Sequence, residues 1–267
     1  MLQRSCHSSW KDLLARPAPG AHVLQIYDAD EFLADAVGHY AAEGLQAGEG
    51  VVLTGTRGHL RAIHERLGAL GIDAAAAARR GQLAAIDAET ALPAVLIDGW
   101  PQDDAFQSAV GRMFAASRAA GFERLRWWGE MTSVLASHGQ EQASFRLEAL
   151  GGELAREQGM SVFCSHLTNK FEPRAYRDGP LVELCRLHSH LIPAQDYVQH
   201  RLVVNRAIEE VLGPLQGPLL QSLMSWRAGD CDMPSSQAML LWIRETMPER
   251  LPQVLLRALE CEGELAG

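Results

Sequence analysis

The chain has no excess of basic residues. Its 24 Lys and Arg are outnumbered by 33 Asp and Glu, which gives a formal net charge of −9 at pH 7 over 267 residues. The basic residues are also scattered rather than gathered into a patch that would neutralise phosphates. We therefore expect no direct binding of nucleic acid.

Long apolar runs are also missing. No stretch approaches the roughly 20 apolar residues that a helix needs to span a bilayer. The start, MLQRSCHSSWKDLL, lacks the continuous apolar centre of a secretory signal. The sequence therefore predicts a cytoplasmic protein that does not insert into a membrane.

Cysteine is sparse, and its spacing matches no disulfide or zinc motif. An odd number of widely spaced cysteines without a CxxC pair disfavours a disulfide framework and a zinc knuckle. We expect reduced thiols, buried or on the surface. The cysteines are Cys6, Cys164, Cys185, Cys231 and Cys261.

Familiar catalytic motifs are absent. There is no GxSxG elbow and no HExxH pair. The segment Thr54–Gly58 (TGTRG) precedes a helical pattern as a phosphate-binding loop does, but the GK[ST] ending is missing. Without that lysine and the hydroxyl that holds Mg²⁺, phosphoryl transfer loses its main charge stabilisers. We expect no catalysis, and a residual anion or nucleotide contact through Arg57 remains an alternative.

From His22 onward, short apolar runs alternate with longer stretches of helical periodicity. This pattern is typical of βαβ units and predicts an α/β fold with a largely parallel sheet flanked by helices. After Pro180 we expect no further strand, only helical segments broken by prolines. The loop prediction is Asp98–Pro101 (DGWP). The predicted strands are His22–Tyr27, Val51–Thr54, Leu83–Ile86, Arg124–Trp128 and Met160–Cys164.

Three regions follow from this pattern. Residues 1–20 form an N-terminal helix and a linker, because ARPAPG at residues 15–20 contains two prolines and a glycine. Residues 21–195 form the α/β domain. Residues 196–267 form a helical C-terminal appendage.

The carboxyl ends of the predicted strands are the expected ligand site, because ligands of open parallel sheets bind there. Tyr27 closes the first strand, and Glu130 directly follows the strand that ends in two tryptophans. Glu130 either binds the ligand or caps a helix with one tryptophan in the core. His22, at the other end of its strand, is expected to be structural. The candidate residues at this edge are Tyr27, Thr54, Arg57, Trp127, Trp128, Glu130, Cys164 and His166.

A metal site is a second possibility. Histidine and cysteine gather at the end of the last predicted strand and in the segment that follows Pro180. Their spacing does not bring four ligands together in a familiar zinc pattern, so ordinary buried histidines remain the alternative. The candidate ligands are Cys164, His166, Cys185, His188 and His190.

Several motifs resemble, in order and spacing, the MEDS domain, the sensory domain of methanogen and methylotroph regulators typified by DcmR. The resemblance covers Ser9 to Pro193. The matching segments are Trp10, LLARP at 13–17, HVLQIY at 22–27, EFL at 31–33, EGL at 43–45, GE at 48–49, GQL at 81–83, GEM at 129–131, FC at 163–164 and HSHLIP at 188–193.

The resemblance implies a fold of the RecA and KaiC type with an eroded phosphate loop. It also implies sensing of small organic compounds, hydrocarbon derivatives above all, and action on a DNA-binding domain or a two-component histidine kinase. By matching motif positions it adds Met131 to the candidate ligand residues. The family-motif positions are His22, Tyr27, Glu49, Glu130, Met131 and Cys164.

The chain departs from the family's regulators because we find neither a helix-turn-helix before the domain nor kinase segments after it. Output is then expected through a partner, a histidine kinase or a transcription regulator. The helical tail supplies a docking or homodimer surface, or simply packs against the sheet. Its apolar residues are Leu219, Leu220, Leu223, Met224, Trp226, Met239, Leu240, Leu241, Trp242 and Ile243.

The leading hypothesis is a non-catalytic signalling module that binds a small apolar organic ligand and relays its presence to a partner. One alternative is a RecA-like switch that retains nucleotide binding or weak ATPase activity. The other is a metal or redox sensor that uses the cysteines and histidines.

Overall fold

The computed structural model describes residues 9–177, 180–226 and 232–266. Its centre is a six-stranded sheet in the order β3-β2-β6-β7-β1-β8, with every neighbouring pair parallel. The α/β fold predicted from the sequence is therefore confirmed. The strands are β1 (His22–Tyr27), β2 (Gly50–Gly55), β3 (Leu83–Asp87), β6 (Leu125–Gly129), β7 (Ser161–Leu167) and β8 (His190–Ile192).

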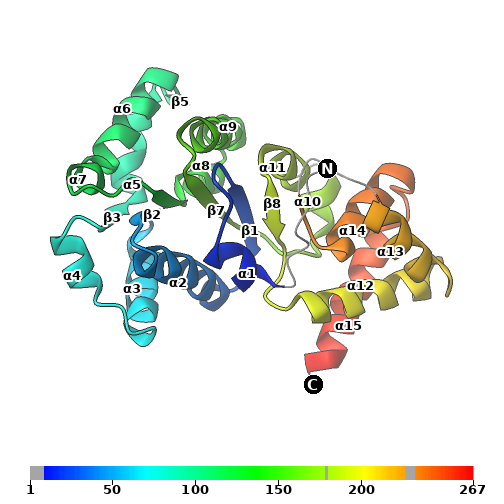
Figure 1. The fold of residues 1–267 in the computed structure, drawn as a ribbon. Helices are drawn as coiled ribbons and strands as arrows, with labels where there is room; N and C mark the ends of the chain where they lie inside the picture. Colours follow the sequence, from blue (N-terminus) through cyan, green and yellow to red (C-terminus); the bar gives the residue numbers. More distant parts are fainter. Residues whose placement is uncertain (1–8, 178–179, 227–231, 267) are drawn as a thin grey trace.

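Helices cover both faces of the sheet (Figure 1). Those preceding β3 are α1 (Trp10–Ala15), α2 (Asp30–Gln46), α3 (Arg57–Ala69) and α4 (Ala74–Arg79). Those between β3 and β7 are α5 (Ala88–Ala91), the 3-10 helix η1 (Leu92–Val95), α6 (Asp103–Met113), α7 (Ala115–Ala119), α8 (Met131–Ser137) and α9 (Glu141–Gln158). The remaining ones are α10 (Pro173–Arg177), α11 (Leu181–Leu187), α12 (Tyr197–Leu212), α13 (Gln216–Trp226), α14 (Ser235–Thr246) and α15 (Leu251–Ala266).

The central strands β1, β2 and β6 are buried along their whole length. On one face, Val23 of β1, Trp128 of β6 and Phe163 of β7 share a core with α1, α2 and α3. On the other face, Val52, Trp127 and the alternate residues of β7 pack against α6, α8 and α9. Because neither face meets water, these strands are largely apolar along both faces, which is why they could be predicted from the sequence.

The C-terminal helices gather beyond β8, at one end of the sheet (Figure 1). Leu24 and Ile26 of β1 and Leu191 of β8 belong to the same core as buried residues of α12, α14 and α15. Of the tail residues named above, Leu220, Met224, Met239, Leu240 and Ile243 are buried in this core. These residues therefore take the packing role, one of the two alternatives.

The other tail residues vary in exposure. Leu219 and Leu223 of α13 are 52% and 47% exposed. Leu241 and Trp242 are partly buried against the same core. The side chain of Trp226 lies outside the described residues, as do Cys6 and Cys231.

Two expectations from the sequence were wrong. A strand does follow Pro180, because β8 pairs with β1 in parallel and forms the edge of the sheet. With only three residues before Pro193, it is too short to show a strand pattern. The segment Asp98–Pro101 is a loop only at Asp98 and Gly99, because Trp100 and Pro101 form a short strand. Asp98 and Gly99 have φ of 53° and 77° and join β4 (Leu96–Ile97) to β5 (Trp100–Pro101), the backbone that Asp-Gly favours in two-residue turns.

Within the described part of the chain, every helix is too short or too polar to cross a membrane.

A buried arginine joins α1 to the sheet. Arg126 of β6 is 2% exposed, and its Nε donates to Glu49, which precedes β2. Its guanidinium also donates to the backbone carbonyl oxygens of Leu14 at 2.9 Å, Ala15 at 3.0 Å and Tyr40 at 3.1 Å. The two carbonyl groups at the end of α1 are thus satisfied inside the protein. Glu49, a family-motif position, therefore has a structural contact.

Replacing this arginine should destabilise the fold strongly. Arg126→Met leaves the Glu49 carboxylate buried without its buried partner, so we expect a loss of about 3–5 kcal/mol in the free energy of unfolding. The double variant Arg126→Met/Glu49→Met should recover part of that loss. Chemical denaturation measures both.

Arg124→Met is the matched control. Arg124 also pairs with Glu49, at 2.7 Å between Nη2 and Oε1, but its side chain is 71% exposed. Its loss should cost about 1 kcal/mol or less. If both variants lost the same free energy of unfolding, burial would not be what makes the Arg126–Glu49 pair important.

Candidate functional site

At the carboxyl edge of the sheet, Glu130 stands at the centre of a polar cluster. Its Oε2 accepts a hydrogen bond from the backbone N–H of Thr56 at 2.9 Å, and its Oε1 lies 2.6 Å from Nδ1 of His59. On the other side of the ring, Nε2 of His59 lies 3.4 Å from Asp30. Tyr27 packs edge-on against the same ring at 6.1 Å between centroids. The carboxyl edge therefore brings Tyr27 and Glu130 together, and adds His59.

These contacts shift the pKa values of two ionisable groups, His59 and Tyr27. The hydrogen bond that His59 donates to the Glu130 carboxylate raises the pKa of His59 above its ordinary 6.5, although partial burial opposes this. Burial, with the charge of Glu130 next, raises the pKa of the Tyr27 phenol. The cluster thus holds a carboxylate and a histidine that favours its charged form.

Glu130 also occupies the place where a phosphate-binding loop would hold an anion. Thr56 is the N-cap of α3, and its backbone N–H points to the Glu130 carboxylate instead of a ligand. Arg57 is 87% exposed and pairs with Asp87 at the end of β3, at 2.6 Å. The backbone N–H of Thr56 and the guanidinium of Arg57, both in the turn after β2, are therefore already paired with carboxylates of the protein.

The two tryptophans lie on opposite faces of the sheet and belong to the core. Trp127 donates to Thr54 Oγ1 at 3.0 Å, and Trp128 donates to Ser165 Oγ at 3.0 Å. Met131 is 2% exposed. Gly55 has no room for a Cβ, which would lie 2.4 Å from the ring of Trp128. The side chains predicted as pocket walls here thus fill the protein interior.

A cavity of about 580 Å³ opens beside this edge, where β1, β7 and β8 end. Small-molecule sites are commonly of this size. Its apolar wall comes from Trp10, Ile26 and Phe32, which are at most 4% exposed. The opposite wall comes from the segment Pro193–His200 and from Glu262 of α15. The cavity therefore lies between the sheet and the C-terminal helices.

Two polar groups stand in the cavity wall. Lys170 Nζ lies 3.0 Å from Glu262 and 3.5 Å from Asp28, so it joins α15 to the end of β1. His200 Nδ1 bonds Ser236 Oγ at 2.8 Å, but its buried Nε2 has no hydrogen-bond partner in the described part of the chain. Burial, with Lys170 next, lowers the pKa of His200 to about 3, so the ring is neutral. A buried polar atom without a partner is uncommon in a folded protein and needs an explanation, such as a contact with a bound molecule.

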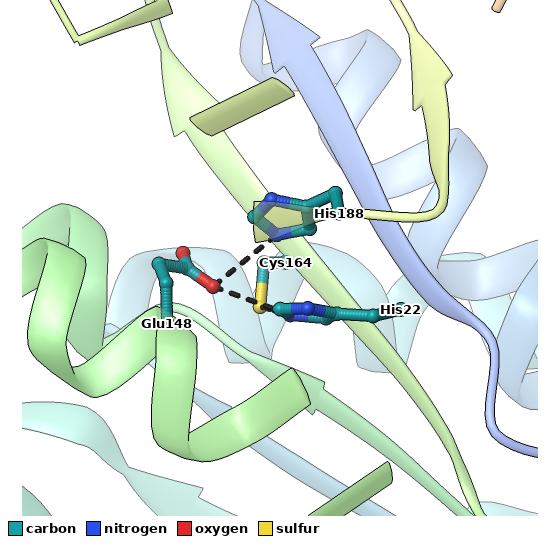
Figure 2. A group of neighbouring side chains, drawn as sticks. All are labelled: His22, Glu148, Cys164 and His188. Atoms are coloured by element: carbon teal, nitrogen blue, oxygen red, sulfur yellow. Dashed lines mark hydrogen bonds and ion pairs between the residues drawn. The ribbon is translucent and has the colours of Figure 1, made fainter. Parts of the chain in front are cut away.

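A second polar group is buried away from this edge, around Glu148 of α9. Glu148 Oε1 lies 2.7 Å from His166 Nε2, and Oε2 lies 3.3 Å from His22 Nε2 and 3.2 Å from His188 Nε2. Cys164 Sγ lies 3.4 Å from His22 Nε2. Figure 2 shows Glu148, His22, Cys164 and His188 converging from separate elements. We call these four residues the Glu148 cluster.

Burial and the neighbouring ionisable groups together shift the pKa values in this cluster. Burial and the neighbouring His188 lower the pKa of His22. Burial alone would raise the pKa of Glu148, but the histidines, His188 first, hold it well below its usual value. Burial and the Glu148 charge raise the pKa of the Cys164 thiol well above its usual value.

The structure corrects two details of the sequence interpretation. Cys164 lies in the middle of β7, paired with Leu24, because the strand continues to Leu167. Of the candidate metal ligands, Cys185 lies in the apolar core under the C-terminal helices, and His190 is a residue of β8 that contacts Ser189. Neither belongs to the Glu148 cluster.

Sequence reasoning missed Glu148, His59 and His200. For Glu148 a signal was present, because it follows Leu147 on the apolar face of its helix, four residues after the buried Ser144. A carboxylate on such a face needs a buried partner. His59 and His200 stand on helices without a comparable pattern, so only the folded chain places them.

The raised pKa of His59 leads to a pH-dependent prediction. A group whose pKa is higher in the folded state stabilises the fold fully below its unfolded pKa, here near 6.5, and loses that effect as the pH rises through the folded value. Glu130→Gln removes the charge that raises this pKa. The cost of Glu130→Gln in free energy of unfolding should therefore be larger at about pH 5.5 than at about pH 9.

Denaturant unfolding at both pH values measures this difference, and NMR titration of His59 measures the pKa directly. In a His59→Gln background the pH dependence should vanish. A cost of Glu130→Gln that is independent of pH in the His59 protein would contradict the assignment.

The chain was compared with known proteins. No curated protein matches it. Among solved structures it is similar to a KaiC-like protein from the hyperthermophilic archaeon Pyrococcus horikoshii OT3, with 17% sequence identity and a TM-score of 0.40. The match covers 56% of this chain, which spans 64% of the length of that protein. The fold class follows from the order of the six parallel strands.

A family model matches most of the α/β domain. It is described as MEDS, the MEthanogen/methylotroph, DcmR Sensory domain, and it covers residues 21–188. This range runs from just before β1 to the last histidine of the Glu148 cluster. The chain therefore belongs to the MEDS family of sensory domains.

Proposed function

We propose that this chain is a non-catalytic sensory module whose ligand is a small organic molecule bound in the cavity at the carboxyl end of the sheet. Membership of the MEDS family supports the sensory role. One observation supports the cavity as the ligand site. The cavity walls come from both the sheet and the C-terminal helices, so a ligand there contacts the two parts at once.

The cavity wall indicates the chemistry of the ligand. Trp10, Ile26 and Phe32 offer an apolar surface, and His200 offers one neutral ring nitrogen. Lys170 already faces two carboxylates, Asp28 and Glu262. An anionic ligand would have to compete with these carboxylates. A largely apolar compound with one hydrogen-bonding group suits this wall best.

The position of the cavity also supports a mechanism of relay. Lys170 bridges Asp28, beyond β1, to Glu262 of α15. Trp10 Nε1 donates to the backbone oxygen of Gln195 at 2.8 Å, and both residues line the same cavity. A ligand that prefers one arrangement of these contacts shifts the population toward it. The C-terminal helices then present that arrangement to a protein partner, a histidine kinase or a transcription regulator.

The nucleotide alternative has less support. In the turn after β2, Glu130 already accepts from the backbone N–H of Thr56, and Arg57 already pairs with Asp87. A phosphate would have to displace a carboxylate that is 3% exposed. ATP with Mg²⁺ is therefore expected to leave the melting temperature unchanged.

Blocking the cavity mouth tests the proposal. Ala29 is an exposed residue in the cavity wall, with an extended backbone that tolerates any side chain. A thermal-shift screen of short hydrocarbons, halogenated compounds and methylated compounds should yield one that stabilises the wild type. At a hundred times its Kd such a compound stabilises by about 2.7 kcal/mol. Ala29→Trp should weaken its binding by at least about tenfold.

Ala47→Trp is the matched control, because Ala47 is an exposed alanine at the other end of α2 and outside the cavity. It should bind the compound as the wild type does. Unchanged affinity in Ala29→Trp would show that the ligand binds elsewhere. Stabilisation by ATP with Mg²⁺ alone would favour the nucleotide-binding switch.

A further inference from the structure

The Glu148 cluster brings four donor atoms together inside the protein. These atoms are His22 Nε2, Glu148 Oε2, Cys164 Sγ and His188 Nε2, and all lie within 4.8 Å of one another. The four side chains are buried and come from β1, α9, β7 and the residue after α11 (Figure 2). Four elements thus bring nitrogen, oxygen and sulfur donor atoms close together.

Backbone contacts determine which nitrogen of each ring faces that point. His22 Nδ1 lies 3.0 Å from the carbonyl oxygen of Leu187, and His188 Nδ1 lies 2.7 Å from that of Leu184. A carbonyl oxygen only accepts, so each Nδ1 carries the proton. With Nδ1 occupied in this way, Nε2 is the nitrogen of each ring that faces the cluster and can bind a metal ion. Carbonyl contacts of this kind orient histidines that bind metals.

This arrangement leaves an oxygen of the Glu148 carboxylate facing a ring nitrogen of His188. Glu148 Oε2 and His188 Nε2 are 3.2 Å apart, yet both are buried without a hydrogen-bond partner among the residues that the structure describes. The other carboxylate oxygen, Oε1, is satisfied by His166. Lone pairs that converge in a buried site need a proton or a cation between them.

The spacing fits a metal ion. Bonds of about 2.0–2.3 Å in tetrahedral geometry place ligand atoms roughly 3.3–3.6 Å apart. The neighbouring pairs here are 3.3 Å apart for His22 with Glu148, 3.2 Å for His188 with Glu148 and 3.4 Å for His22 with Cys164. The helix α9 also makes room, because a Cβ at Gly152 would lie 2.9 Å from His22 Nδ1. Glycine at 152 therefore allows His22 to lie against α9.

We propose that His22, Glu148, Cys164 and His188 bind one divalent transition-metal ion of the zinc type. Two imidazoles, one carboxylate and one thiolate form a ligand set that suits Zn²⁺. On binding, the Cys164 thiol gives its proton to solvent and the thiolate sulfur bonds the metal, so binding strengthens as the pH rises. With four protein ligands the ion ties β1, β7 and α9 to the segment that leads into β8.

Metal analysis of the full-length protein, purified without a histidine tag, tests the proposal first. We expect about one zinc per chain as the ligand set requires, and its removal by a chelator should lower the melting temperature. Adding Co²⁺ to the apo protein should produce the thiolate-to-cobalt charge-transfer absorption. A chain that neither retains zinc nor shows this absorption overturns the proposal. A shared proton would then occupy the cluster.

Variants of the cysteines show which one supplies the sulfur ligand. Cys164→Ser should abolish the charge-transfer absorption and weaken Co²⁺ binding by at least about 100-fold, since even changes in the groups that orient metal ligands cost 10–100-fold. Cys185→Ser, a change at a similarly buried cysteine outside the cluster, should leave both unchanged. His188→Gln should keep the absorption at high Co²⁺ but lower the affinity. Retention of the absorption in Cys164→Ser would place the thiolate elsewhere and contradict the proposal.

Discussion

The buried carboxylate of Glu148 is the interaction on which the arrangement of the sheet edge depends. An ion taken out of water costs several kcal/mol unless partners compensate it. Here Oε1 pairs with His166 of β7, and Oε2 faces His22 of β1 and His188 after α11. The carboxylate therefore joins neighbouring strands to α9, and joins both to the segment that continues as β8. A metal ion in the Glu148 cluster would strengthen the same connection.

The cavity depends on that connection, because its far wall directly follows β8. His188 is anchored at Glu148, β8 pairs with β1, and Pro193–His200 then line the cavity. Strand β1 thus contributes residues to both sites. His22, its first residue, contacts the Glu148 cluster, and Ile26, near its last, lies in the cavity wall. Because β1 is buried throughout, a structural change in the Glu148 cluster at its first residue can reach the cavity near its last residue, and the reverse.

The central strands and the edge strand β3 could be predicted from the sequence, whereas the other edge strand, β8, and both sites could not. A strand such as β1, covered on both faces, is largely apolar along its whole length. β8 has three residues, and pairing with β1 rather than its own pattern makes it a strand. Cys164 and His188 were recognised as candidate ligands, but their neighbours in space, His22 and Glu148, are distant in the sequence. The cavity likewise joins residues from the first helix to the last, so no local pattern reveals it. The roles of the predicted edge residues, Tyr27 and Glu130 among them, stay predictions.

Hydrogen exchange in Glu148→Gln tests most directly whether this carboxylate positions the cavity wall. The account predicts faster exchange of backbone amides in β8 and residues 193–200 than in the wild type, while β2 and β3, on the far side of the sheet, keep their protection. Exchange that changes only within α9, with β8 and the cavity wall as protected as before, would contradict it.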